Sequence, residues 1–187
     1  MTTSGAQAEE RCSSRLVFEC LGGEHAAELF DVLSHPLVSQ YLGCEPPQSV
    51  AELAVQFTRM AIGPAANSND KAWINYAVRR KLDEKWIGRV QATIHDAWAE
   101  VAYLFGPSYW GHGYAAESLS WLHTRLQHDY GLTEFWATTA CTNERSICLL
   151  LRSGYESTNC TDARTLSTHA PGDVAFRYMV HIDSSSA

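Results

Sequence analysis

The sequence lacks the features that mark several common classes of protein. Its 187 residues contain no C-x-x-C pair, no H-E-x-x-H motif and no apolar run approaching the roughly 18 residues of a membrane span. A basic excess is also missing, because 14 Lys and Arg stand against 21 Asp and Glu, for a net charge of −7. Nucleic-acid-binding domains usually carry a basic face. We therefore expect no metal site, no membrane segment and no nucleic-acid partner.

Cysteine usage and the amino-terminal segment bear on the compartment. Six cysteines are scattered through the chain, and residues 1–14 are small and polar, without the apolar core of a secretory signal. Reduced thiols in a cytoplasmic protein are the simplest interpretation. We expect a flexible segment over residues 1–14, one domain over 15–182 and a tail over 183–187.

Hydrophobic periodicity predicts one α/β domain. Strands are expected over residues 15–20, 72–79, 85–94, 99–105, 134–140, 155–160 and 174–182. Helices are expected over residues 24–33, 50–60, 114–130 and 143–153. The three strands between 72 and 105 are joined by short polar turns and indicate an antiparallel meander. The expected fold is a mixed, mostly antiparallel sheet of about six to seven strands flanked by about four helices.

The most informative segment is W-G-H-G-Y-A-A at residues 110–116, between a predicted strand and a predicted helix. Glycines let the backbone approach a ligand closely. The unpaired N–H groups of a first helical turn, together with the helix dipole, favour a phosphate. The segment also satisfies the dinucleotide fingerprint G-x-G-x-x-A, but too little chain follows it for the remaining units of a nicotinamide-binding fold. A glycine-rich turn without a ligand is the other interpretation.

The surroundings of this loop resemble the GCN5-related N-acetyltransferase (GNAT) family. The likeness extends from Arg15 to Ile182 and is closest to the ribosomal-protein alanine acetyltransferases, the RimJ/RimL-like branch. It implies acetyl-CoA as cosubstrate and acetyl transfer to a primary amine. The segments that carry it are R-L-V at 15–17, L-S-H-P-L-V-S-Q-Y-L at 33–42, W-I-G-R at 86–89, A-E-V-A-Y-L-F at 99–105, N-E-R-S at 143–146 and R-S-G-Y at 152–155.

The resemblance assigns residues to the cosubstrate. The glycine loop would hold the pyrophosphate through backbone N–H groups, and the fourth strand would diverge from the fifth so that its backbone pairs with the pantetheine arm. Trp110 and His112 stand where many relatives have Arg, Lys or Gln, so backbone groups would make the main contribution to phosphate binding. The residues implied for acetyl-CoA binding are Leu104, Phe105, Gly106, Trp110, Gly111, His112, Gly113, Tyr114, Ala115, Asn143 and Ser146.

Two side chains are candidates for proton transfer. Glu100 stands where the similar strand of the histone-acetyltransferase branch has its catalytic glutamate, and a base is needed because an alkylamine is almost fully protonated at neutral pH. Many relatives carry a tyrosine acid where this chain has Leu150, and the ribosomal branch instead implies Ser146 as the acid. The alternative interpretations are a polar residue at a strand start for Glu100, a first-turn helix residue for Ser146 and an N-cap for Asn143.

The acceptor is the least defined partner. A peptide or protein amino terminus and a small amine such as an antibiotic or polyamine both suit the resemblance, and the net charge favours a cationic acceptor. The implied groove could be lined by the aromatic residues Tyr41, Trp73, Tyr76, Trp98 and Phe176 and by the loop acids Glu45, Asp70, Asp96 and Asp173. The alternative, which is favoured for the aromatic residues, is that they belong to the core and that the acids are ordinary surface charges. A non-catalytic acyl-CoA-binding or sensing module is the alternative function. Sheet-edge dimers are common in this fold and suggest a homodimer by analogy alone.

Overall fold

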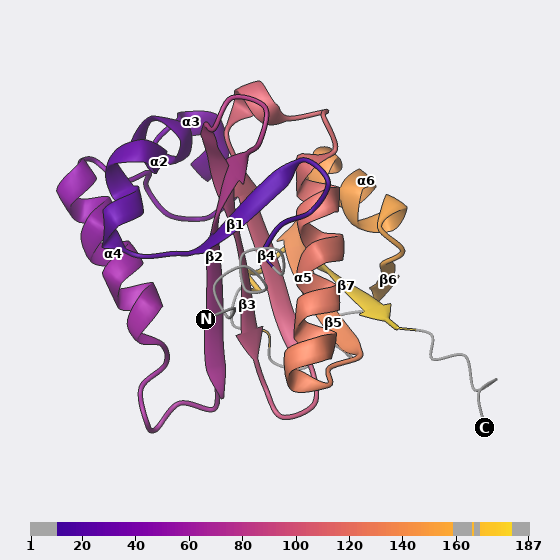
Figure 1. Cartoon of the computed structure of the whole chain (residues 1–187). Helices are drawn as coiled ribbons and strands as arrows, with labels where there is room; N and C mark the ends of the chain where they lie inside the picture. The colour runs from indigo at the N-terminus through magenta and orange to yellow at the C-terminus, as the bar shows by residue number, and fades with distance from the viewer. Residues whose placement is uncertain (1–10, 159–165, 167–168, 181–187) are drawn as a thin grey trace.

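One twisted sheet separates two layers of helices (Figure 1). The computed structural model describes residues 11–158, 166 and 169–180. Its strands follow the spatial order β1-β2-β3-β4-β5-β7-β6. Their bounds are Leu16–Cys20 (β1), Ala72–Arg80 (β2), Trp86–Ile94 (β3), Ala99–Phe105 (β4), Glu134–Ala140 (β5), Glu156–Thr158 (β6) and Asp173–Met179 (β7). The predicted mixed α/β sheet is confirmed.

Five α-helices and two 3₁₀ turns accompany the sheet within the described residues. They are η1 (Gly23–His25), α2 (Ala26–Leu33), α3 (Pro36–Ser39), α4 (Val50–Ile62), η2 (Pro107–Tyr109), α5 (Tyr114–Tyr130) and α6 (Glu144–Arg152). The helix predicted over 24–33 divides into η1 and α2. The short helix α3 was not predicted; Pro36 opens it, and the His35 Nδ1 accepts a hydrogen bond from the Leu37 N–H at 3.2 Å.

The two closing strands are the least complete match to the predictions. β6 and β7 fall inside the predicted ranges or within one residue of them. Residues 159–160 and 181–182, which were predicted to extend these strands, lie outside the described residues. The loop between them was predicted to be long and polar, and most of it also lies outside the described part of the chain.

The two faces of the sheet bury separate cores. On one face α5 packs Leu119, Leu122 and Leu126 against strand residues that include Val90 and Val101. On the other face, α2 and α4 pack their own apolar residues, and Figure 1 shows these helices in indigo and magenta on the side away from α5. The helix α5 ends at Gly131 with φ 68°, in the left-handed conformation that commonly follows the last turn of a helix.

The ladder between β4 and β5 is very short. These strands run parallel and pair only at Ala99–Phe135 and Glu100–Trp136, whereas β2, β3 and β4 form the predicted antiparallel meander. Beyond Glu100, β4 continues for residues 101–105 with no strand partner on that side among the described residues. We call residues 101–105 the open edge of β4.

Among the described residues, no helix is both long and apolar enough to cross a membrane. The same part of the chain contains no group of three or more His, Cys, Asp or Glu side chains that could hold a metal ion. The described cysteines are free thiols, and Cys160 lies outside that part.

Candidate active site

The predicted phosphate-binding loop lies exposed at the N-terminal end of α5. Gly111 and Gly113 each have φ 78°, in the left-handed region that favours glycine. Gly113 is the N-cap of α5 and has no side chain to cap the helix, and the first helical hydrogen bond runs from the Glu117 N–H to the Gly113 carbonyl at 3.0 Å. The N–H groups of residues 114–116 therefore have no helical acceptor and form a site for a phosphate.

Packing does not explain the first glycine of this loop. A Cβ at Gly111 would meet no other atom within 4 Å, so the residue is needed for its backbone conformation and not for space. Residues 111–113 are exposed, which leaves this backbone open to a ligand. Binding of the pyrophosphate by this loop, which the family resemblance implies, stays a prediction.

Arg15 supports the loop from the start of the domain. Its Nη1 donates to the His112 carbonyl at 2.9 Å, its Nε donates to Glu117 Oε2 at 2.7 Å, and its guanidinium lies 4.7 Å from the centre of the Tyr114 ring. Ser13 Oγ and the Arg15 N–H donate to Glu117 Oε1 at 2.6 and 2.8 Å. Desolvation raises the pKa of Glu117, but these hydrogen bonds outweigh it and hold that pKa below its usual range.

The amino-terminal segment therefore begins to contribute before residue 15. Cys12 forms a β-bridge with Val17, and the Phe18 N–H donates to the Arg11 carbonyl at 2.8 Å. Residues 11–14, which were assigned to a flexible segment, pack against β1 and α5. Residues 1–10 of that segment lie outside the described residues.

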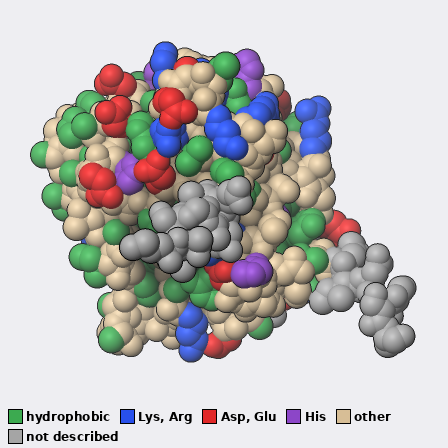
Figure 2. All heavy atoms as spheres, viewed as in Figure 1, with side chains coloured by type: hydrophobic (Ala, Val, Ile, Leu, Met, Phe, Trp, Pro, Cys, Tyr) green, Lys and Arg blue, Asp and Glu red, His purple; other side chains and the backbone are tan. Residues whose placement is uncertain are grey.

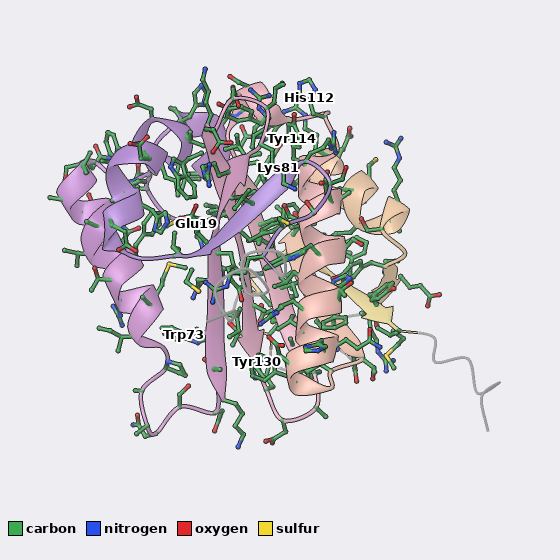
Figure 3. The ribbon with its side chains drawn as sticks, viewed as in Figure 1. Glu19, Trp73, Lys81, His112, Tyr114 and Tyr130 are labelled. Carbon is green, nitrogen blue, oxygen red and sulfur yellow. The ribbon has the colours of Figure 1, made fainter. Side chains whose placement is uncertain are left out.

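Cationic side chains gather around the loop. Arg80 Nη1 donates to the Tyr114 hydroxyl at 3.4 Å, and Lys81 Nζ donates to the Ser13 carbonyl at 2.6 Å. Figure 2 shows Lys and Arg side chains clustered over this end of α5, and Figure 3 shows Lys81, His112 and Tyr114 together there, with Tyr130 at the other end. An acidic protein thus presents a cationic surface beside its glycine loop.

Trp110 anchors the loop to the end of β4. Its Nε1 donates to the Phe105 carbonyl at 2.7 Å, and its ring packs against both cores. On its outer side, the guanidinium of Arg145 from α6 lies 4.7 Å from the centre of the ring. The Gly106 N–H donates to the Ile87 carbonyl at 3.1 Å. The prediction that Phe105 and Gly106 offer these groups to pantetheine is therefore revised, because both are bonded within the protein.

The open edge of β4 presents the backbone of alternate residues. Hydrogen bonds from Gly106 to Ile87 at one end, and from His95 to Trp98 at the other, fix the phase of the β3–β4 ladder. Because hydrogen-bonded pairs alternate along an antiparallel ladder, the odd-numbered residues 101, 103 and 105 direct their backbone groups away from β3. Leu104, which was predicted to serve the pantetheine arm, directs its own backbone groups to β3.

Glu100 lies at the point where β4 and β5 diverge. It pairs with Thr93 on β3 and with Trp136 on β5, and its side chain is buried. Leu104 packs with the core of α2 and α4, whereas Val101 belongs to the core of α5. Since side chains alternate along a strand, the carboxylate of Glu100 lies on the α2 and α4 face, beside the open edge.

Ser146 lies on the opposite face and is paired with a residue that sequence reasoning missed. The Tyr103 hydroxyl and Ser146 Oγ are 2.7 Å apart. Burial raises the pKa of Tyr103 to about 12, against the opposing effect of this hydrogen bond, so the phenol stays protonated at neutral pH. Leu150, in the position of the usual tyrosine acid, is fully buried in the core. The sequence did contain a signal for Tyr103. Because side chains alternate along a strand, a residue three positions after Glu100 lies on the opposite face of the sheet, the face that α6 covers.

Asn143 caps α6, as one interpretation of the sequence predicted. Its Oδ1 accepts a hydrogen bond from the Ser146 N–H at 3.2 Å. The cap uses only the oxygen of the amide, and nothing in the described part of the chain accepts a hydrogen bond from its Nδ2. The same residue thus fixes the first turn of α6 and keeps donors for a ligand.

The residues suggested for the acceptor groove do not lie together. Tyr76 and Phe176 are buried in the core of α5, so their proposed role in the groove was wrong. Trp73 pairs with Thr93 on the Glu100 face, and its Nε1 donates to Asp70 Oδ2 at 2.9 Å. Its position toward the far end of β2, away from the glycine loop, is visible in Figure 3.

The remaining suggested residues have local roles or stay exposed. Trp98 is buried and stacks on His95 with ring centres 3.8 Å apart. Asp96 pairs with Lys71 at 3.1 Å, and Asp173 accepts a hydrogen bond from the Ala170 N–H at 3.0 Å. Tyr41 and Glu45 are exposed between α3 and α4.

Comparison with known sequences identifies acetyltransferases along most of the chain. The family described as "Acetyltransferase (GNAT) domain" matches residues 15–156. The protein is 27% identical over 148 residues to the uncharacterized N-acetyltransferase YoaA of Bacillus subtilis (strain 168). The aligned region covers 77% of this chain and 81% of YoaA.

Solved structures share the fold. The Microcin C7 self-immunity acetyltransferase MccE, in complex with acetyl-CoA and AMP, has a TM-score of 0.72 at 16% identity and covers 90% of this chain and 94% of its own. A Salmonella typhimurium acetyl transferase that modifies the N-terminal serine of 50S ribosomal protein L7/L12 has a TM-score of 0.72 at 15% identity, covering 90% and 97%. The chain therefore belongs to the GNAT acetyltransferase family and is an acyltransferase.

Proposed function

We propose that this protein transfers the acetyl group of acetyl-CoA to a primary amine by direct attack in a ternary complex. The observation that carries the proposal is the divergence of β4 and β5. It leaves the open edge of β4 between Glu100 on one face and the Tyr103–Ser146 pair on the other. A base and an acid on opposite sides of one backbone edge are what an amine and a departing thiolate require.

Acetyl-CoA supplies an activated acetyl thioester when bound. Its phosphates would lie on the N–H groups of residues 114–116, beside Arg145 and the loop that Arg15 supports. Its pantetheine arm would pair with the backbone of Val101 and Tyr103 on the open edge and with the Nδ2 of Asn143, because the Phe105 carbonyl is already bonded to Trp110. These groups are held by the fold before any ligand arrives, so their order costs little at binding.

Glu100 would take a proton from the ammonium form of the acceptor, directly or through a water, and pass it to solvent. The neutral nitrogen then forms a C–N bond to the thioester carbonyl, and an N–H of the open edge donates to the oxygen that gains charge. As the C–S bond breaks, Ser146 donates a proton to the sulfur and recovers one from Tyr103. The nitrogen gives its second proton to Glu100, which has already passed the first to solvent, and Tyr103 regains a proton from solvent, so that one proton is released for each acetyl group transferred.

Two classes of acceptor are candidates. A peptide or protein amino terminus as acceptor is supported by the fold that this chain shares with the enzyme that modifies the N-terminal serine of L7/L12. A small-molecule amine as acceptor is supported equally by the fold that this chain shares with the aminoglycoside acetyltransferase AAC(6′)-Ib, solved in complex with coenzyme A. A cytoplasmic location and a domain that ends at residue 182 stay predictions from the sequence, and the homodimer stays a prediction by analogy with the fold.

The test is thiol release from acetyl-CoA in the presence of a panel of amines that includes peptides, aminoglycosides and polyamines. We expect amine-dependent release of CoA and the acetylated amine as product. Tight CoA binding without release for any amine would instead identify a non-catalytic acyl-CoA-binding module. Titration with NAD(P) provides the control for the nicotinamide alternative.

A further inference from the structure

Arg89 lies on the same face of the sheet as the proposed base. In the β3–β4 ladder Arg89 pairs with Leu104, and Thr93 pairs with Glu100. Leu104 packs with the core of α2 and α4, whereas Val90, next to Arg89, belongs to the core of α5. The alternation of side chains therefore directs Arg89 to the face from which an amine reaches Glu100.

The guanidinium of Arg89 has no carboxylate partner among the described residues. Its Nη1 donates to the Oε1 of Gln91, two residues along the same strand. The neighbouring strand provides a contrast, because Arg79 pairs with Glu19 at 3.1 Å and Arg80 pairs with Asp83 at 2.6 Å. The loss of solvent around the Arg89 guanidinium lowers its pKa to about 10.

A half-buried cation without an anion costs folding free energy, so its presence needs another explanation. The glutamine oxygen that it holds is neutral and occupies one side of a guanidinium that has five N–H donors. The planar arrangement of these donors suits a carboxylate, which can accept two parallel hydrogen bonds. An anion brought by a ligand would compensate the charge that the fold leaves uncompensated.

The position of Arg89 favours the acceptor over acetyl-CoA as the source of that anion. The phosphate site lies at the start of α5, which covers the opposite face of the sheet. After desolvation, the other influence on the pKa of Arg89 comes from Cys44, in the segment between α3 and α4, which raises it. Leu104 and Glu100 are four residues apart along β4, about 13 Å of strand, which an amine and a carboxylate on one small molecule can bridge with the help of both side chains.

We propose that Arg89, held by Gln91, binds a carboxylate of the acceptor, so that the preferred substrates carry an amine and a carboxylate on one molecule. This inference rests on the proposed function. Arg89 thus gives this face a cationic group beside the carboxylate of Glu100. The carboxylate has two sources, the terminus of an amino acid or short peptide and an acidic side chain next to an amino terminus.

The experiment compares acceptors that differ only in that group. Glycylglycine against glycylglycinamide tests a terminal carboxylate, and Ser-Asp-amide against Ser-Asn-amide tests a side-chain carboxylate. We expect at least one carboxylate member to be preferred in kcat/KM by about 10–100-fold, the range of a charge-assisted hydrogen-bonded pair. Arg89→Gln removes the preference by lowering only the carboxylate member, and Arg89→Lys restores part of it because lysine keeps the charge without the fork.

Arg59→Gln is the matched control, since it removes one positive charge from an exposed position on α4. We expect it to leave both members of each pair unchanged. Thermal unfolding without ligand separates a structural role, because Arg89→Gln removes an uncompensated charge and should leave the midpoint equal or higher. A lower midpoint, or an equal loss for carboxylate and carboxamide acceptors, would overturn the inference, as would wild-type protein with no carboxylate preference in either pair.

The failure of the proposed function looks different. It appears as no thiol release for any amine, whatever the residue at position 89. The carboxylate site is then read by calorimetric titration of glycylglycine into the protein saturated with CoA. Binding that is lost in Arg89→Gln and kept in Arg59→Gln supports the site, and equal affinity in wild type and Arg89→Gln contradicts it.

Discussion

The two faces of the sheet contribute to the site by different means. On the α5 and α6 face, the groups that would meet acetyl-CoA belong mostly to the backbone, and they are fixed by the cap at Gly113 and by the open edge of β4. On the α2 and α4 face, the proposed chemistry would depend on side chains, above all Glu100 and Arg89. A backbone site depends on conformation and can bind one ligand in many relatives, whereas a side-chain site can change its partner with one substitution.

The largest expected effect tests the side-chain face. Glu100→Gln keeps the shape of the residue but removes the base, so we expect kcat to fall about 10²–10⁴-fold for an alkylamine acceptor. The measurement is the pH–rate profile of thiol release, which should lose its acidic limb. Glu156→Gln changes an exposed glutamate on β6 and serves as the control. An unchanged profile for Glu100→Gln would remove Glu100 from the mechanism.

The next largest effect concerns a buried histidine between α5 and the sheet. Burial lowers the pKa of His123 to about 4, and its ring stacks on Phe135 and Tyr178 while Nε2 lies 2.7 Å from the Tyr155 hydroxyl. Because the folded pKa is below the unfolded value of about 6.5, the unfolded chain binds more protons between these values. The free energy of unfolding is then unaffected above about pH 6.5 and falls by up to about 3 kcal/mol as the pH drops toward 4.

Denaturant titrations between pH 4 and 7 check this pH dependence. His123→Gln keeps an amide for the Tyr155 hydroxyl but cannot titrate, so its unfolding free energy should depend less on pH. His128→Gln, on the exposed side of the same helix, should retain the wild-type slope. Equal slopes in wild type and His123→Gln would show that other groups cause the acid sensitivity.

A smaller effect tests whether the backbone face depends on conformation. Gly113→Ala and Gly131→Ala place the same methyl group at opposite ends of α5, at φ 78° and 68°. Each should cost about 1–2 kcal/mol of stability, because the left-handed region is unfavourable for alanine. Only Gly113→Ala should also raise KM for acetyl-CoA, by about tenfold, since a shift of that energy is tenfold in affinity. The same KM in both variants would contradict phosphate binding by the loop.

The smallest expected effect concerns the Tyr103–Ser146 pair. Tyr103→Phe removes one hydrogen bond to Ser146, worth about 0.5–1.5 kcal/mol, so we expect kcat to fall about 2–10-fold with little change in KM for acetyl-CoA. Ser146→Ala should reduce kcat further, and the double variant should equal Ser146→Ala if the tyrosine acts only through the serine. Full activity of Ser146→Ala would exclude the proposed acid.

Sequence reasoning reached the backbone face more completely than the side-chain face. The loop at 110–116 and the helix after it follow from local rules of glycine and helix termini, which a single segment reveals. The suggestions of Tyr76 and Phe176 failed because alternation alone does not say which face of a strand each core covers. Arg89 and Arg15 depend on register and on contacts between distant segments, for which a single sequence contains no local signal. The spacing of Tyr103 from Glu100 indicates its face of the strand but not its contact with Ser146.

The bond between Arg15 and Glu117 joins residues 102 positions apart. Bringing two such distant residues together costs conformational entropy, and contacts of this kind form slowly because that entropy is lost before the contact stabilises the chain. The phosphate loop therefore gains its support only after four strands and helices α2 to α5 have been assembled around it. During synthesis, a ribosome-bound chain that ends before α5 lacks the Arg15–Glu117 bond and the support that it gives to the loop.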